Sequence, residues 1–452
     1  MTSFSMECFQ NEFLPEGGDE MHAVLTVTAK GTGSGPATTE ERSELILLDC
    51  SGSMSGKKLR SAKAATAAAI DCIPDGVRFG VISGNHKAEM TYPLEGPLAV
   101  ASPETRQAAK AAVKTLESAG GTAMGTWIRL AAKTFGEETG IRHAILLTDG
   151  KNENEEPSDL DAALQLAEGK FQCDCRGVGE HWVVAELQKV AGALVGTCDI
   201  VADPADLEND FSAIMRDALS KQVAAVVLRV WTPQGGEVLA LRQMEPPLDL
   251  VATRVEAGPR MGDYGTGSWG DESRDFFLSL RVLPADVDEE KLAARVTLLV
   301  GDEPGEQGMI RAVWTDDAAR STQINRRVAA AMDEEELADE IQGVVDSFRI
   351  GDVDSATNRA GRAVQMAHQA GNHDVIDRLS KLVEIEDAAT GRVRLKAKVD
   401  ALDVMIFETK STRTSRTPKS TQFHPFAGSD PERCGMCGLA ISADAHIATS
   451  AS

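Results

Sequence analysis

The chain has 452 residues, of which 42% are hydrophobic and only 4% are aromatic. Because one hydrophobic core rarely serves more than about 250–300 residues, this length predicts roughly two to four domains. The formal net charge of −24 disfavours nucleic acid and anionic membrane surfaces as the main partner, since both repel an acidic protein.

Neither the first residues nor the cysteine content indicates export. The sequence MTSFSMECFQNEF lacks the basic and apolar segments of a secretory signal. No run approaches the roughly 18 apolar residues that a membrane span needs. Eight cysteines without an export signal are expected to be thiols or metal ligands rather than disulfides. We therefore expect a cytoplasmic protein.

The first expected element is a β-strand over residues 22–29, followed by a linker rich in Gly, Thr and Ser over residues 30–43. No other strand is expected before residue 44, and a lone strand cannot pair its backbone groups. We therefore expect residues 1–36 to join a β-sandwich further along the chain, with an α/β domain inserted between them. The apolar residues on one face of this strand are Ala23, Leu25 and Val27.

Apolar strands alternate with helical stretches over residues 37–220, which predicts a doubly wound, Rossmann-like α/β domain. The runs LILLD and AILLTD are apolar on both faces, as central parallel strands covered by helices must be. Ser102, Pro103 and Glu104 are typical of a helix start. The expected strands are 44–49, 78–84, 89–94, 143–149, 171–179 and 197–203, and the expected helices include 57–73, 103–117, 125–136, 158–168 and 204–220.

Helical periodicity is replaced by strict alternation over residues 221–320, which predicts an all-β sandwich of about 100 residues. Residues 321–409 are then expected to form a small helical domain. Within it, a stripe of alanines along one helix allows a second helix, 374–385, to pack closely: Ala356, Ala360, Ala363 and Ala367. This pair resembles one tetratricopeptide unit, but a simple packing pair is favoured over a peptide-binding array. A linker, 410–422, leads to a tail, 423–452.

The turn after the first buried strand, DCSGSMSGKK at residues 49–58, could be a phosphate loop or a cation site. A Walker loop has four residues between its glycines, then Lys and Ser or Thr. Here three residues separate Gly52 from Gly56, and Lys57 is followed by another lysine. The nucleotide interpretation is therefore rejected.

The same turn carries Asp49, Ser51 and Ser53 at alternate positions, a pattern shared by metal loops and helix caps. Thr122 stands at the entry to a later helix, and Asp149 ends the second buried strand. Loops at the carboxyl ends of central strands converge on one crevice, so all five side chains are expected to meet there. Two carboxylates and three hydroxyls suit a hard cation, Mg²⁺ or Mn²⁺, and leave one coordination position open.

This constellation resembles the metal-ion-dependent adhesion site (MIDAS) of von Willebrand factor A (VWA) domains. The resemblance covers roughly residues 40–220 and extends to the strand CRGVG and the closing LVGTCDIVADPADLENDF. It implies that Ser51, Ser53 and Thr122 ligate magnesium, while Asp49 and Asp149 act directly or through water. The flanking sandwich and helices look like those of intracellular bacterial members of the family.

The C-terminal tail carries a second candidate metal site. Cys434 and Cys437 form a C-x-x-C pair, with His424 ten positions before it and His446 nine positions after it. Two Cys and two His make a tetrahedral Zn²⁺ set, although the histidine spacing fits no standard finger. A tail with free thiols or a redox pair is the alternative.

No nucleophile with a general base and no cofactor fingerprint stands out, so we do not expect an enzyme. The favoured interpretation is a magnesium-dependent adaptor or scaffold that binds an Asp or Glu of a protein partner. A regulatory subunit of an ATPase, chelatase, kinase or phosphatase complex is a second hypothesis, and a self-assembling structural protein is a third. Neither nucleic acid nor membrane is expected as a partner.

Overall fold

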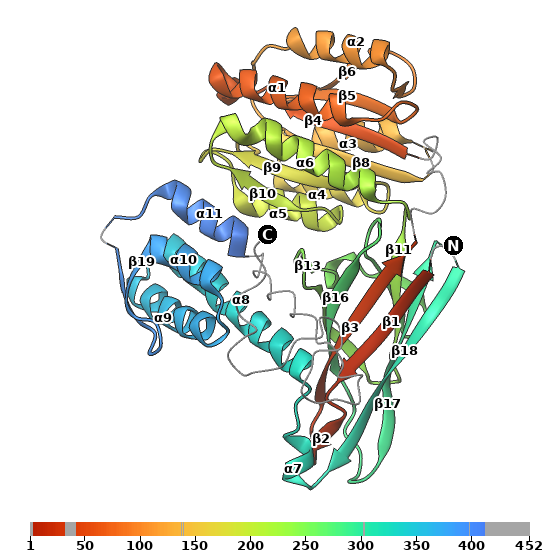
Figure 1. The fold of residues 1–452 in the computed structure, drawn as a ribbon, viewed down its shortest axis with the longest axis vertical. Coiled ribbons are helices and arrows are strands. Elements are labelled where there is room, and N and C mark those ends of the chain that lie inside the picture. The colour runs from red at the N-terminus through yellow and green to blue at the C-terminus, as the bar shows by residue number, and fades with distance from the viewer. Residues whose placement is uncertain are drawn as a thin grey trace, which may run out of the picture. The chain divides into compact units, whose positions relative to one another are not determined.

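The computed structural model describes residues 3–31, 42–136, 138, 140–301, 303–396 and 398–411. A seven-stranded sheet lies at the centre of the α/β domain (Figure 1). Its path is β10-β9-β8-β4-β5-β6, with β7 paired to β5, and the strands from β10 to β5 are parallel. The strands are β4 (Arg42–Asp49), β5 (Arg78–Gly84), β6 (Ala88–Tyr92), β7 (Ala99–Val100), β8 (Ile141–Thr148), β9 (Gln172–Val178) and β10 (Cys198–Val201).

Helices cover both faces of this sheet because its central strands are apolar on both sides. Leu45 and Leu47 of β4 belong to the core beneath one set of helices, and Ile46 and Leu48 to the core beneath the other. The first set is α3 (Met124–Phe135), α4 (Pro157–Ala167) and α5 (Val184–Ala193); the second is α1 (Lys57–Cys72), α2 (Pro103–Lys114) and α6 (Leu207–Ser220). The predicted doubly wound fold is confirmed.

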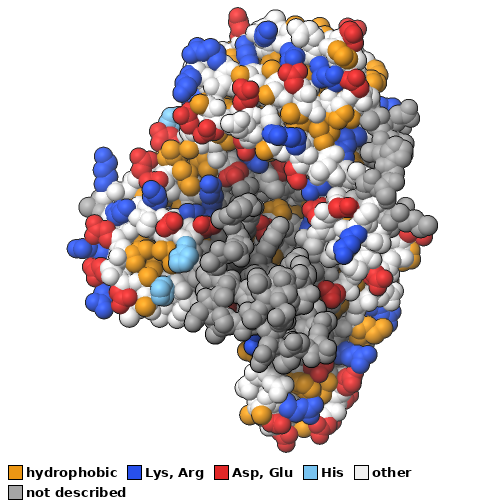
Figure 2. Space-filling view, in the orientation of Figure 1, with side chains coloured by type: hydrophobic (Ala, Val, Ile, Leu, Met, Phe, Trp, Pro, Cys, Tyr) orange, Lys and Arg blue, Asp and Glu red, His pale blue; other side chains and the backbone are white. Residues whose placement is uncertain are grey.

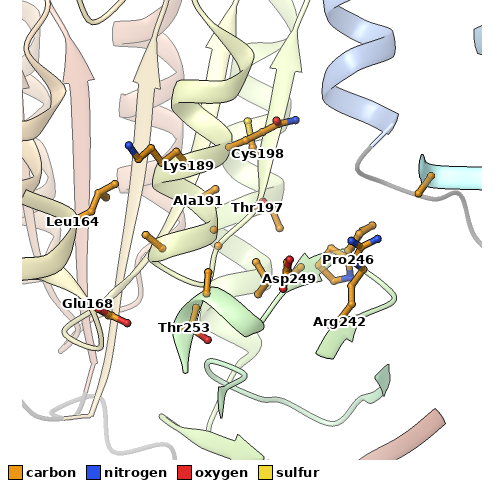
Figure 3. A pocket seen from close by; sticks show the side chains of 18 of the residues that line it. Leu164, Glu168, Lys189, Ala191, Thr197, Cys198, Arg242, Pro246, Asp249 and Thr253 are labelled. Carbon is orange, nitrogen blue, oxygen red and sulfur yellow. The ribbon is translucent and has the colours of Figure 1, made fainter. Parts of the chain in front are cut away.

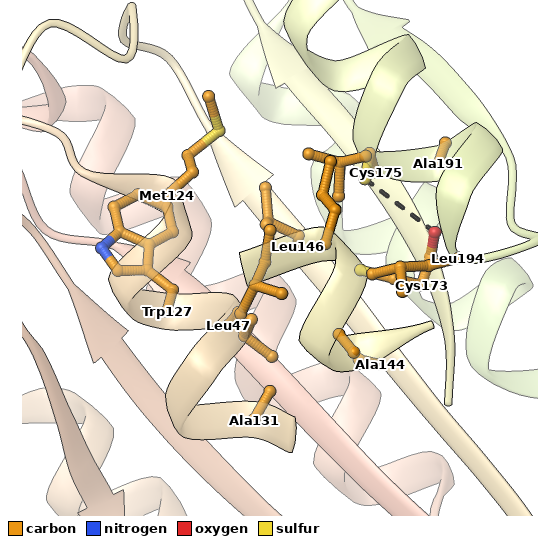
Figure 4. Close-up of a cluster of buried hydrophobic side chains, with 14 of the residues drawn as sticks. Leu47, Met124, Trp127, Ala131, Ala144, Leu146, Cys173, Cys175, Ala191 and Leu194 are labelled. Atoms are coloured by element: carbon orange, nitrogen blue, oxygen red, sulfur yellow. Dashed lines mark hydrogen bonds between the residues drawn. The ribbon is translucent and has the colours of Figure 1, made fainter. Parts of the chain in front are cut away.

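The first of these cores contains the cysteines of β9. Cys173 and Cys175 are fully buried, and Figure 4 shows them among aliphatic side chains, with Leu146 of β8 between them and Trp127. The Cys175 thiol donates to the carbonyl oxygen of Cys173 at 3.9 Å. Burial first, and then the neighbouring Cys173, raise the pKa of the Cys175 thiol, so this sulfur is a packed apolar group rather than a nucleophile.

Two further sheets, which are mainly antiparallel, pack around one shared core. The first has the order β1-β3-β16-β12-β13 and the second β14-β15-β11-β17-β18-β2. The strands are β1 (Ser3–Gln10), β2 (Phe13–Pro15), β3 (Glu20–Lys30), β11 (Val226–Trp231), β12 (Glu237–Gln243), β13 (Leu248–Asp249), β14 (Val255–Gly258), β15 (Met261–Gly265), β16 (Ser273–Arg281), β17 (Glu290–Val300) and β18 (Glu303–Thr315).

The strand expected over residues 22–29 is β3, and it lies between β1 and β16. The expectation that it has no partner before residue 44 is wrong. Strand β1 pairs with it along its whole length, from Ser3 opposite Lys30 to Gln10 opposite Ala23. The α/β domain lies between β3 and β11 in the chain, so it is inserted between strands of the two sheets.

The last part of the described chain is not purely helical. It contains α7 (Ala318–Ser321), α8 (Arg326–Ile350), α9 (Val353–Gln369), α10 (His373–Leu382) and α11 (Ala401–Ser411), and also a hairpin of β19 (Val383–Asp387) and β20 (Arg392–Leu395). The helix expected over 374–385 ends at Leu382, because Val383 and Ile385 alternate with glutamates in the two-residue period of a strand. The alanine stripe of α9 is fully buried.

The hairpin packs on α9 where both segments have a glycine. A Cβ on Gly361 of α9 would lie 2.5 Å from the carbonyl oxygen of Gly391, which is the turn residue of the hairpin with φ of +68°. Only glycine allows such an approach without displacing a backbone. No helix among the described residues is long and apolar enough to cross a membrane.

The chain enters the inserted α/β domain at β4 and leaves it after α6, and one arginine connects these two points by hydrogen bonds. Arg42, the first residue of β4, donates to the carbonyl oxygen of Ala218 at 2.6 Å and to that of Lys221. Ala218 and Lys221 stand at the end of α6, just before the chain enters β11. The inserted domain therefore begins and ends at one corner.

Candidate metal centre

The predicted loop at residues 49–58 joins β4 to α1. Asp49 is the last residue of β4 and is fully buried. One of its carboxylate oxygens, Oδ1, accepts the backbone N–H of Ser51 at 2.7 Å, and the other accepts the hydroxyl of Thr148. A 3₁₀ turn over Gly52–Met54 then brings the Oγ atoms of Ser51 and Ser53 within 2.9 Å of each other.

Asp149 comes directly after β8 and is also fully buried. Its Oδ1 accepts the hydroxyl of Ser53 at 2.6 Å, and its Oδ2 pairs with the ammonium of Lys58. Thr122 stands two residues before α3 and is 4% exposed. Its backbone N–H donates to Oδ1 of Asn154 at 3.0 Å, which fixes it to the loop after β8.

Backbone hydrogen bonds hold the first loop against the segment before α3. The N–H of Gly52 donates to the carbonyl of Gly120, and the N–H of Ala119 donates to the carbonyl of Cys50, both at 2.8 Å. The three loops that follow β4, precede α3 and follow β8 are thus joined by fixed contacts. A site on them is already organised by the chain itself.

Gly150 shows that the three hydroxyls face one small space. A Cβ placed on this glycine would lie 2.8 Å from Oγ1 of Thr122, 3.2 Å from Oγ of Ser53 and 3.7 Å from Oγ of Ser51. The structure therefore brings all five sequence-predicted residues together. The donors are oxygens only, which is the ligand type that Mg²⁺ and Mn²⁺ prefer.

The electrostatics of the site favour a cation. Burial raises the pKa of Asp49, the hydrogen bonds from Thr148 and Ser51 partly offset this, and the charge of Asp149 raises the pKa further. Two buried carboxylates in one site destabilise each other's charged form, and a cation between them relieves that cost. Among the described residues, no group of three or more His, Cys, Asp and Glu could hold a metal.

Lys58 belongs to the site but was not predicted from the sequence. It is the second residue of α1, and a cation in the first turn opposes the helix dipole. The sequence did offer a signal, because two adjacent lysines stand at this unfavourable position directly after a turn that contains an aspartate. Such a pair indicates that one of the lysines has a carboxylate partner. The predicted zinc ligands His424, Cys434, Cys437 and His446 lie outside the described residues.

A cavity of about 660 Å³ lies away from this centre, and none of the five residues lines it (Figure 3). Its wall combines residues of α4, α5 and β10 with Pro246, Pro247 and residues of α8. Two ion pairs hold its edges, Lys189 with Asp161 and Arg242 with Glu335. The cavity is a separate feature of the molecule from the metal centre.

Comparisons with known proteins concern the family and the fold of the chain. A family model described as von Willebrand factor type A domain matches residues 45–200, and one described as von Willebrand factor type A C-terminal domain matches residues 365–411. The structure of a von Willebrand factor type A protein from Catenulispora acidiphila is 44% identical, with a TM-score of 0.86. That likeness covers 91% of this chain and 97% of the other.

Two other relatives are more distant. The ArnB paralog VWA2 from Sulfolobus acidocaldarius is 17% identical with a TM-score of 0.59, covers 91% of this chain and 98% of its own, and shares the fold. An uncharacterized protein from Synechocystis sp. is 29% identical over 181 residues, and this chain matches only 40% of its length. On the 44% identity over nearly the whole of the Catenulispora chain, this protein belongs to the von Willebrand factor type A family.

Proposed function

We propose that this chain is a magnesium-dependent protein-interaction module of the intracellular bacterial type, and that a partner's Asp or Glu binds at its metal centre. The observation that carries the proposal is the convergence of three hydroxyls and two buried carboxylates beside Gly150. A bound Mg²⁺ or Mn²⁺ supplies a local positive charge and a coordination position for an acidic ligand.

The chain's own residues perform the remaining tasks. Ser51, Ser53 and Thr122 offer neutral oxygens, so the ion keeps much of its charge for the partner. Asp49 and Asp149 would hold the ion with their negative charge, and the hydrogen bonds that they accept from Thr148 and Ser53 fix their orientation. An acidic protein of net charge −24 repels an acidic ligand in general, and a divalent ion reverses that sign locally. We propose an adaptor or scaffold without catalysis of its own.

The sharpest test keeps every donor and fills the space between them. Gly150→Ala adds one methyl group 2.8 Å from the Thr122 hydroxyl, so we expect Mn²⁺ binding, measured by electron paramagnetic resonance, to weaken by about tenfold or more, that is by about 1.4 kcal/mol. Gly192→Ala is the matched control, because a Cβ on Gly192 of α5 meets nothing within 4 Å. Equal Mn²⁺ affinity in the two variants would place the ion elsewhere.

Partner binding is tested with the same variants. Proteins retained from a cell lysate by the wild-type chain in Mg²⁺ should be released by a chelator. They should not be retained by Asp149→Ala or Gly150→Ala, whereas Thr122→Ala should be milder, because water can replace one neutral hydroxyl. Retention of the same proteins by Asp149→Ala in chelator would show that the interaction uses another surface.

A further inference from the structure

The Lys58 ammonium lies where a positive charge is needed in the metal centre. Asp149 is fully buried, and its Oδ1 is satisfied by the Ser53 hydroxyl while its Oδ2 is satisfied by Lys58. The Lys58 side chain is 26% exposed, so its charged end reaches a buried carboxylate from the surface. Lysine therefore provides the counter-charge that the buried aspartate requires.

We propose that Lys58 is an internal counter-cation that competes with the divalent metal ion for Asp149 and thereby sets the metal affinity of the site. The inference rests on the proposed function, since it assumes that the ion binds at the five residues described above. It goes further by assigning a role to a residue outside the five-residue set. When the metal ion binds, the Lys58 ammonium leaves Asp149, so that one cation replaces the other.

The geometry makes the two cations compete. An ion among the hydroxyls of Ser51, Ser53 and Thr122 also draws on the charge of Asp149, which the ammonium already neutralises. Two positive charges sharing one buried carboxylate repel each other strongly, because screening is weak there.

Lys58 can leave Asp149 for solvent, because its own side chain is already 26% exposed. The neighbouring Lys57 is at the surface, where its ammonium lies 3.5 Å from Asp203 and its side chain is 67% exposed. The four-carbon stem of lysine is flexible, and the charged end is strongly hydrated in water. Because Lys58 sits at the positive end of α1, the helix dipole does not hold the ammonium in place.

If Lys58 supported metal binding instead of competing with it, removal of Lys58 would change the metal affinity in the opposite direction. If the ammonium only oriented Asp149 for the ion, its removal would weaken metal binding. Competition predicts that its removal strengthens metal binding. The two roles are therefore separated by the direction of one measurement.

The experiment titrates Mn²⁺ into the full chain and follows binding by electron paramagnetic resonance. We expect Lys58→Met to bind Mn²⁺ about tenfold more tightly than the wild type. Lys58→Arg keeps the charge and should stay within about twofold of the wild type, a difference of about 0.4 kcal/mol. Lys57→Met is the matched control, because it removes the same charge one residue away and should also leave the affinity unchanged. Affinity that is unchanged or lower in Lys58→Met overturns the proposal.

Thermal unfolding provides a second readout that needs no partner. In chelator Lys58→Met should unfold at a lower temperature than Lys57→Met, since Asp149 is left buried without a cation, and Mn²⁺ should raise the midpoint more than it does for the wild type. If Lys58→Met does not fold in chelator, Lys58→Gln is used instead. If Mn²⁺ raises the unfolding midpoint of Lys58→Gln and of the wild type equally, Lys58 does not compete with the metal ion and the proposal is overturned.

The outcomes separate this inference from the proposed function. Wild-type Mn²⁺ binding that is lost in Gly150→Ala but equal in Lys58→Met removes only the role of Lys58. If Gly150→Ala and Lys58→Met both leave Mn²⁺ binding unchanged, the proposed function and the role of Lys58 are both overturned. The same holds if neither the wild type nor Lys58→Met binds Mn²⁺.

Discussion

A second buried ionic cluster lies at the opposite end of the strands that carry the metal centre. Glu44 of β4 and Asp174 of β9 flank His143 of β8, with Oε2 of Glu44 2.7 Å from Nδ1 and Oδ2 of Asp174 3.0 Å from Nε2. The Thr197 hydroxyl donates to the other oxygen of Asp174 at 2.6 Å. A buried histidine between two carboxylates is stable only in its charged form.

The pH dependence of this cluster follows from the position of its protons. Burial alone lowers the pKa of His143, but Glu44 and Asp174 more than offset this and raise it to about 10 from its usual 6.5. A raised pKa contributes stability that is complete below pH 6.5 and is lost as the pH rises through about 10. Burial raises the pKa of Asp174, yet the hydrogen bond and charge of His143 lower it well below its usual range. That contribution is present above pH 3.8 and is lost as the pH falls further.

His143→Gln should therefore be most damaging between about pH 3.8 and 6.5. From pH 6.5 to about 10 the wild-type free energy of unfolding should fall more steeply than that of the variant, by about 1.4 kcal/mol per pH unit at most. Chemical denaturation at a series of pH values measures both slopes. Parallel curves for the two proteins would show that His143 is neutral in the folded chain.

Sequence patterns could not reveal this cluster, although they did point to the five residues that the structure brings together in the candidate metal centre. Asp49, Ser51 and Ser53 share one loop, so their spacing was visible along the chain. Glu44 and His143 are 99 positions apart and meet only because β4 and β8 pair in that register. Lys58 was missed for a related reason: its partner Asp149 lies 91 positions away, in the loop that follows β8.

At the scale of elements, the central strand β3 should hold the first antiparallel sheet together. It pairs with β16 over nine residues and with β1 over eight, so it supplies hydrogen bonds on both sides. Ala23, Leu25 and Val27 are fully buried in the core shared by the two sheets. Deletion of β3 exposes both this core and one edge of β16.

Two truncations of the full chain separate the contributions of β1 and β3. Removal of residues 1–10 should speed amide hydrogen exchange in β3 but leave β16 largely protected. Removal of residues 1–32 should abolish protection in β16 and destabilise residues 222–315. Exchange measured by mass spectrometry reports each strand separately. Unchanged protection of β16 without residues 1–32 would contradict the central role of β3.

Helices and strands with a clear hydrophobic period in the sequence were predicted well. Those whose formation depends on packing against other parts of the chain were not. The apolar runs of β4 and β8 and the capped start of α2, where Ser102 and Thr105 form a capping box, were visible in the sequence. Strand β1 was missed although Phe4, Met6 and Cys8 are partly buried and alternate with exposed residues in the two-residue period of a strand. Helix α5 and the hairpin of β19 and β20 are short, and helix α9 and its Gly361 stabilise the hairpin from outside.

At the scale of the whole molecule, charges of both signs are mixed over the face shown in Figure 2. Figure 2 shows Asp and Glu side chains interspersed with Lys and Arg on the face in view, without a broad basic area. This distribution accords with the net charge of −24 and favours solubility over nonspecific adhesion. Specific attraction of an acidic partner then has to come from a local cation.

The tail beyond the described residues remains the basis of a separate prediction. If His424, Cys434, Cys437 and His446 bind zinc, elemental analysis should find one Zn²⁺ per full-length chain and none in a chain ending at residue 420. Cys434→Ser in the full chain should reproduce the loss. Equal zinc in the full and truncated chains would exclude the tail as the site.

The corner at Arg42 has a mechanical consequence for the proposed function, in which a partner binds at the metal centre. Strand β4 runs from that corner, where Arg42 bonds to the end of α6, to Asp49 in the metal centre, a length of roughly 23 Å. Tension between a bound partner and the two antiparallel sheets therefore travels along β4 itself. Strands β5 and β8 pair with β4 on either side. A force along β4 is therefore shared by all the hydrogen bonds of both pairings at once, instead of breaking them one after another. A strand paired on both sides resists pulling far better than a loop would, so under the proposed function we expect the contact between metal and partner to break before the sheet does.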